Sequence, residues 1–147
     1  LKQADFGSVH VSLLRDGESE TPTYHLFNEK TLKMMKPTAF LVNTSRGPVV
    51  DEVALAKALK ENWIAGAALD VYEKEPLPPD SPLRDPAIED RCRLYPHFAS
   101  AGKITRLSTD PNKGMAGRCV QGLIDVLEKN YGGDIKKMPY VVNKEAF

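Results

Sequence analysis

The chain has 147 residues, and its 20 lysines and arginines are balanced by 20 aspartates and glutamates. This balance gives no overall field that favours a nucleic acid or a membrane surface, so neither partner is expected. The 41% hydrophobic content is typical of a globular protein, and no apolar run approaches the roughly 18 residues of a membrane span. The two isolated cysteines predict neither a disulfide framework nor a metal site, and a cytoplasmic location is expected.

Short apolar runs alternate with segments of helical periodicity through most of the chain. Strands are predicted over residues 6–14, 39–42, 64–71 and 92–95. Helices are predicted over 29–36, after an Asn28 cap, and over 52–62, after an Asp51 cap. The segments 15–23 and 73–90 are predicted loops, and a helical pattern from 103 to 129 is broken near Pro111 and followed by an extended tail. This alternation predicts an α/β fold with a parallel sheet.

Charged side chains follow three of the predicted strands, at the point where each strand ends. Arg46 follows the second strand and His97 follows the fourth. Asp70 lies at the end of the third strand, and Glu73 and Glu75 follow it. Ligands of open parallel sheets bind at this carboxyl edge. An arginine can hold a carboxylate with two hydrogen bonds, and a histidine oriented by a carboxylate can exchange a proton near neutral pH. Together these side chains suit a small keto or hydroxy acid.

Each of these residues also has a purely structural interpretation. An arginine at a strand end is most often part of a surface ion pair worth at most about 1 kcal/mol. His10, within the first predicted strand, and His25, in a loop before a helix, are interpreted as structural. Glu73 is expected to be solvated. A functional interpretation of Arg46, Glu75 and His97 is favoured only by their expected position at the same carboxyl edge of the sheet.

Two longer motifs carry a resemblance to a known family. The stretch NTSRGPVVDEVALAKALKENWIAGAALDVYEKEP resembles the cofactor-binding domain of the D-isomer-specific 2-hydroxyacid dehydrogenases, and PHFASAGKITR resembles the histidine segment of that family. The similarity extends from Ala4 to about Arg118 and is closest to glyoxylate/hydroxypyruvate reductase-like members. It implies the C-terminal half of a Rossmann-like, doubly wound sheet in residues 1–104. Residues 105–147 are then expected to pack on a substrate domain.

The resemblance also implies roles for individual residues. Arg46 would hold the carboxylate and keto oxygen of a 2-keto acid, His97 would act as the acid/base, and Glu75 would be its partner. Asp70 would lie near the nicotinamide of NAD or NADP. The segments that would line the dinucleotide contain Val11, Thr44, Ser45, Arg46, His97, Ala99 and Ser100. A homodimer is expected for the intact enzyme.

The chain departs from the family pattern in several places. Ser12 stands where proline is usual, and Phe98 to Gly102 differ from the common sequence. A glycine-rich phosphate loop, which precedes these motifs in the family, has no match here. The chain is therefore expected to be a piece of a longer enzyme. Two alternatives stay open: a dinucleotide-sensing corepressor of the same fold, and a fragment that binds nothing alone.

Overall fold

The structure, a computed structural model, describes residues 1–108, 110, 114–128, 130–134 and 137. The chain forms two compact units, Leu1–Phe98 and Ala99–Phe147. The first unit holds the sheet, and the second holds the C-terminal helices. The predicted division after residue 104, with the following part packing on a substrate domain, stays a prediction.

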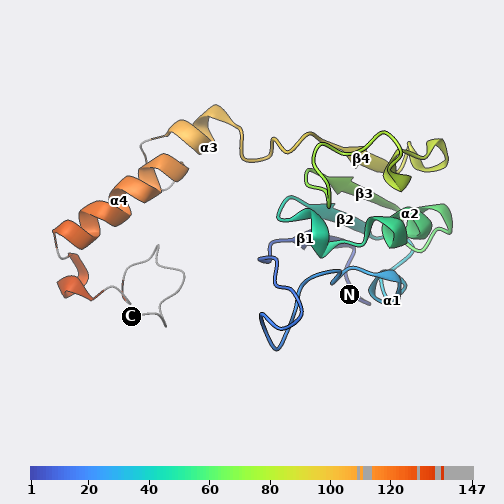
Figure 1. The fold of residues 1–147 in the computed structure, drawn as a ribbon, viewed down its shortest axis with the longest axis horizontal. Helices are drawn as coiled ribbons and strands as arrows, with labels where there is room; N and C mark the ends of the chain where they lie inside the picture. Colours follow the sequence, from blue (N-terminus) through green and yellow to red (C-terminus); the bar gives the residue numbers. More distant parts are fainter. Residues whose placement is uncertain (109, 111–113, 129, 135–136, 138–147) are drawn as a thin grey trace. The chain divides into compact units, whose positions relative to one another are not determined.

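The first unit is built on a four-stranded parallel sheet in which the strands lie in chain order (Figure 1). The strands are β1 (Phe6–Val9), β2 (Phe40–Asn43), β3 (Gly66–Leu69) and β4 (Cys92–Leu94). All three pairings are parallel, and Val9, Asn43 and Leu69 share one row of the register. The carboxyl ends of the strands therefore meet at one edge. The predicted parallel α/β fold is confirmed.

Two helices begin at the predicted capping residues. Asn28 Oδ1 accepts from the amides of Lys30 and Thr31 and starts α1 (Glu29–Leu32). Asp51 Oδ1 accepts from the Ala54 amide and starts α2 (Glu52–Lys60). Each cap satisfies amides that have no partner within the first turn of a helix.

Several predicted elements are too long: the third strand, expected over 64–71, spans Gly66–Leu69, and the second helix, expected over 52–62, ends at Lys60. The first strand was expected over 6–14 but ends at Val9, so His10 follows the strand instead of lying within it. The apolar residues after Val9 belong to a loop, although their sequence has the apolar pattern of a strand. Helix α1 was expected over 29–36 but ends at Leu32, because the chain continues as turns towards Pro37.

The two faces of the sheet differ in how they are covered. Alternate residues such as Leu41 and Leu69 are buried with Leu32 of α1 and Leu55 of α2 in one hydrophobic core. On the opposite face Phe6 and Phe40 stack with ring centroids 5.9 Å apart, and they are 75% and 44% exposed. Within the first unit, the helices therefore cover one face.

The segment between β3 and β4, predicted as a loop over 73–90, contains two short 3-10 helices. These are η2 (Pro82–Arg84) and η3 (Pro86–Ile88), each begun by a side-chain cap. Leu77, Leu83 and Ile88 of this segment are buried in the core. A further 3-10 helix, η1 (Gly47–Val49), leads from β2 towards α2.

The second unit contains α3 (Lys103–Leu107), α4 (Met115–Leu127) and the 3-10 helix η4 (Asn130–Gly133). The predicted interruption of the helical pattern is confirmed, although Pro111 lies outside the described residues. Most of the predicted tail also lies outside them. No helix in the described part of the chain is long and apolar enough to cross a membrane.

Candidate active site

The turn that carries Arg46 is held by one buried amide at the end of β2. Asn43 has no exposed surface; its Nδ2 donates to the Arg46 carbonyl at 3.0 Å. Its Oδ1 accepts from the amide and the hydroxyl of Ser45, both at 3.1 Å. The Arg46 side chain is exposed, and its Nη1 donates to the Ser45 carbonyl at 2.7 Å. Asn43 thus fixes the backbone from which the guanidinium projects.

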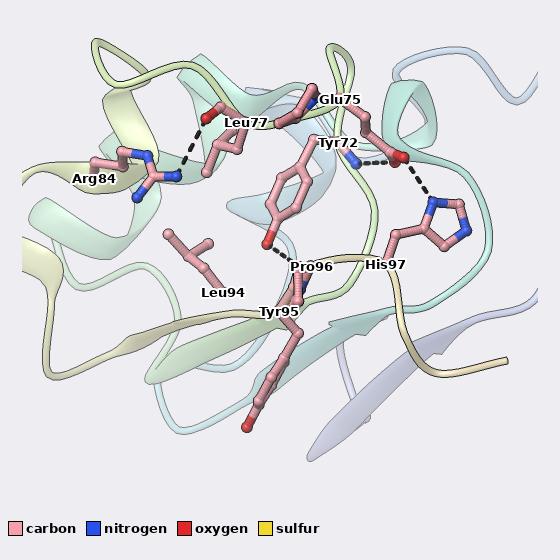
Figure 2. A pocket seen from close by; sticks show the side chains of 9 residues that line it. Tyr72, Glu75, Leu77, Arg84, Leu94, Tyr95, Pro96 and His97 are labelled. Carbon is pink, nitrogen blue, oxygen red and sulfur yellow. Dashed lines mark hydrogen bonds and ion pairs between the residues drawn. The ribbon is translucent and has the colours of Figure 1, made fainter. Parts of the chain in front are cut away.

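Glu75 and His97, which are 22 residues apart in the sequence, are brought together (Figure 2). His97 Nδ1 donates to Glu75 Oε2 at 2.6 Å, and the Tyr72 amide donates to Glu75 Oε1 at 3.0 Å. Burial raises the pKa of the Glu75 carboxyl, but these two hydrogen bonds outweigh it and hold the pKa below its usual value. Since Nδ1 is bound to the carboxylate, Nε2 is the ring atom turned away from Glu75.

The backbone of His97 is held in an unusual conformation. Its φ of 56° lies in the left-handed region that residues other than glycine rarely adopt. On one side, the Tyr72 hydroxyl lies 2.7 Å from the Tyr95 carbonyl and 3.0 Å from the Leu69 carbonyl. On the other side, Asp70 Oδ1 accepts from the Phe98 amide at 2.9 Å. Anchors on both sides therefore impose the conformation that turns the imidazole towards Glu75.

Asp70 and Tyr72 make these contacts from buried positions. Asp70 is 4% exposed, and its bond to Phe98 ties the end of β3 to the histidine segment. Burial raises the pKa of Tyr72 to about 12, so its hydroxyl keeps its proton. Asp70 was predicted to lie near a nicotinamide; the structure adds a role in positioning, and the cofactor contact stays a prediction.

Two cavities open beside these groups. One, of about 510 Å³, lies beside the histidine pair and is lined by Tyr72, Glu75, Leu77, Arg84, Leu94 and His97, among others (Figure 2). The other, of about 480 Å³, lies beyond β1 and β2 and is lined by His10, Val11, Ser12, Leu13, Ser45 and Arg46. Arg46 and His97 thus border different cavities of the first unit.

The remaining predicted residues are distributed between the two units. Thr44 is exposed beside Ser45 in the first unit. Ala99 and Ser100 begin the second unit, where Arg106 donates to the Ser100 carbonyl at 3.0 Å. Their predicted contacts with a dinucleotide stay predictions.

Three residues have contacts that the sequence did not indicate. His10, interpreted as structural within a strand, lines the same cavity as Arg46. Glu73, expected to be solvated, pairs with His25, whose Nε2 lies 2.7 Å from Glu73 Oε1. The cavity position of His10 could have been predicted if the first strand had been expected to end at Val9. His25 and Glu73 are 48 residues apart, and no local sequence pattern links them.

Sequence comparison identifies the class of protein that this fold and site define. Residues 1–99 match the family described as D-isomer specific 2-hydroxyacid dehydrogenase, NAD binding domain. The chain therefore belongs to the D-isomer-specific 2-hydroxyacid dehydrogenase family.

Among the relatives that the chain resembles are glyoxylate reductases. The chain is 57% identical over 146 residues to a glyoxylate reductase of Thermococcus gammatolerans and 48% identical over 146 residues to one of Thermofilum pendens. Each alignment covers 99% of this chain but 37% of the relative, so the chain spans little more than a third of these proteins.

A solved structure gives the same family. It is a D-isomer specific 2-hydroxyacid dehydrogenase from Xanthobacter autotrophicus Py2, in complex with NADPH and MES. It matches with a TM-score of 0.67 and 29% identity, over 97% of this chain and 50% of that one.

Proposed function

We propose that this chain is the acid/base-bearing part of an oxidoreductase that reduces small 2-keto acids with NADH or NADPH, glyoxylate or hydroxypyruvate being the expected substrates. The observation that carries the proposal is the 2.6 Å contact between His97 Nδ1 and Glu75 Oε2. An ionised carboxylate on one ring nitrogen orients the imidazole and leaves the other nitrogen for the substrate. The family and the glyoxylate reductases among its relatives support the same reaction.

The residues of this chain have separate tasks in that reaction. Arg46 binds the carboxylate of the keto acid, for which its planar guanidinium offers two parallel hydrogen bonds. His97 gives the proton on Nε2 to the keto oxygen as C2 gains a hydride, and the product is the 2-hydroxy acid. Glu75 stays ionised and stabilises the imidazolium before the transfer.

The cavity beyond β1 and β2 is proposed as the part of a nicotinamide dinucleotide site that this chain supplies. It lies at the carboxyl edge of a parallel sheet, where such cofactors bind, and its volume is about 480 Å³. Val11, Thr44 and Ser45 are the residues of the first unit proposed to hold the cofactor, with Asp70 near its nicotinamide. Ala99 and Ser100 are also proposed as cofactor contacts. When bound, the cofactor supplies the hydride.

We also propose a homodimer and a cytoplasmic location for the intact enzyme.

The test uses a polypeptide that spans the full length of the relatives. Oxidation of NADH or NADPH by glyoxylate, followed by absorbance, should be fast for the natural sequence. Arg46→Ala should lower kcat/KM for glyoxylate by orders of magnitude, and Arg46→Lys should restore only a part because lysine lacks the two-bond geometry. Arg93→Ala is the matched control, since Arg93 is an exposed arginine of β4 that donates to the Glu89 carbonyl.

His97→Ala separates an acid/base from a structural histidine. It should largely abolish turnover and leave the affinity for NADH or NADPH nearly unchanged. Lost cofactor affinity would assign His97 a structural role. A small effect of Arg46→Ala would overturn the proposed reaction.

A further inference from the structure

His25 lies where three loops of the first unit meet. Its own loop leads into α1, its backbone amide donates to the Pro48 carbonyl at 2.8 Å, and its ring reaches Glu73. Pro48 follows Arg46 by two residues, and Glu73 precedes Glu75 by two. His25 therefore touches both the arginine loop and the loop that carries the carboxylate of the acid/base pair.

The conformation of His25 is imposed from several sides. Its φ is 48°, in the left-handed region, and Asn28 Nδ2 donates to its carbonyl at 2.9 Å. The imidazole stacks on Tyr24, with ring centroids 4.0 Å apart and an angle of 16° between the planes. A side chain held in this way has few other orientations, so its contact with Glu73 is specified by the fold.

Glu73 is held on its backbone side as well. Its amide donates to Glu52 Oε1, at the start of α2, at 2.7 Å. Burial raises the pKa of the Glu52 carboxyl, and the bond from the Glu73 amide opposes that rise. The Glu73 side chain is 37% exposed, so its pair with His25 is worth at most about 1 kcal/mol of stability. The small contribution of the His25–Glu73 pair to stability does not explain why the backbone of His25 is held in the left-handed region.

We propose that His25 is a positioning residue of the active site, because it joins the arginine loop to the loop that carries Glu75. It touches neither substrate nor the reacting atoms. By binding Pro48 and Glu73 at once, it sets the distance between the group that holds the keto acid and the group that holds His97. This inference rests on the proposed function, and it assigns that function a residue which the acid/base chemistry does not require.

The test is His25→Gly in a polypeptide that spans the full length of the relatives. Glycine keeps the left-handed backbone without strain and removes the ring. We expect kcat for glyoxylate to fall about tenfold, less than the roughly hundredfold that a 1 Å displacement can cost. KM for NADH or NADPH should change by less than about twofold, because glycine keeps the backbone bond to Pro48 and only the contact with the loop that carries Glu75 is lost. A kcat that stays within about twofold of the natural value would overturn the proposal.

Variants of Glu73 distinguish positioning from general stability. Glu73→Ala should reproduce the loss, Glu73→Gln should retain most of the activity because its carbonyl still accepts from Nε2, and His25→Gly with Glu73→Ala should be no worse than either alone. Additive losses would contradict the proposal. If His25→Gly fails to fold, Glu73→Ala decides in its place.

The matched control is Lys36→Ala. It removes another exposed pair of the same length, Lys36 Nζ to Asp5 Oδ1 at 2.7 Å, which lies away from both loops. Its kcat should be unchanged.

The failure of this inference can be told from failure of the proposed function. If the natural sequence reduces neither glyoxylate nor hydroxypyruvate, the proposed function fails. The nitrogen chemical shifts of the His97 ring, measured by NMR in the 147-residue chain, then test the positioning alone. A shift in His25→Gly that is absent in Lys36→Ala supports it, and identical shifts in all three proteins overturn it.

Discussion

Gly47 passes against the backbone of Tyr72 so closely that a Cβ on Gly47 would lie 1.9 Å from the Tyr72 carbonyl carbon and oxygen. No side chain can give way there, because the atoms in the way belong to the main chain. The glycine after Arg46 therefore allows the arginine loop to touch the loop that holds Glu75.

Gly47→Ala is expected to force the two loops apart. The free energy of unfolding should fall by about 1–3 kcal/mol, as for other overpacked sites, and kcat should fall with it. Urea denaturation measures the first effect. Gly122→Ala is the control: a Cβ there meets nothing within 4 Å in the middle of α4, so stability should be unchanged or rise by up to about 1 kcal/mol. Equal stability of Gly47→Ala and the natural protein would show that the loops are free to move apart.

Tyr72→Phe removes the hydroxyl that lies beside the Leu69 and Tyr95 carbonyls and keeps the ring. The Leu69 carbonyl still accepts from the Tyr95 amide, but the Tyr95 carbonyl loses its hydroxyl donor, which costs about 1 kcal/mol and weakens one anchor of the chain before His97. We therefore expect lower stability together with a lower kcat. A loss of stability at unchanged kcat would mean that the Phe98 to Asp70 bond holds His97 by itself.

Glu75→Gln should change how stability depends on pH. The pKa of Glu75 is lowered in the folded chain, so its ionised form stabilises the fold above the ordinary value of 4.5, and this contribution is lost as the pH falls below it. The difference in unfolding free energy between the natural protein and Glu75→Gln should thus shrink between neutral pH and pH of about 3. Other carboxyls titrate in both proteins and cancel from the difference. A difference that grows towards acid would contradict the assignment.

The two cysteines should react at very different rates. Both are free; Cys92 is buried in β4 and Cys119 is exposed on α4. Burial raises the pKa of Cys92 to about 11, so little of it is the reactive thiolate at neutral pH. A thiol reagent should label one cysteine quickly in the native chain and the second only on unfolding. Cys119→Ser should remove the fast phase, whereas a fast phase that survives would place Cys92 within reach of solvent.

The sequence predicted those features that local chemistry determines. The caps at Asn28 and Asp51, the parallel order of the strands and the groups at their carboxyl ends follow from residue types at short spacing. The end of β1 could not be predicted, since Val11 and Leu13 look like strand residues but line a cavity. The end of β1 depends on its partner β2, which lies far along the chain: Val9, the last residue of β1, pairs with Asn43, the last residue of β2.

The contacts between loops could not be predicted for the same reason. His25 pairs with Glu73, and Gly47 packs on Tyr72, across distances in the chain that no periodic pattern records. The pairing of Glu75 with His97 was expected only through resemblance to a family. The residues alone placed both groups at one edge of a sheet, and tertiary packing supplies the 2.6 Å contact.

The buried amide of Asn43 has a consequence for ligand affinity. This one side chain makes two hydrogen bonds with the backbone of Ser45 and Arg46 and a third with the Ser45 hydroxyl, and these bonds order the turn as the protein folds. A carboxylate that binds Arg46 then restricts only the rotamers of the arginine, at a cost of about 0.5–1.5 kcal/mol, and not the main chain of a loop. If Arg46 is the carboxylate site, as proposed, its backbone is preorganised, and small acids can be held there with little loss of entropy.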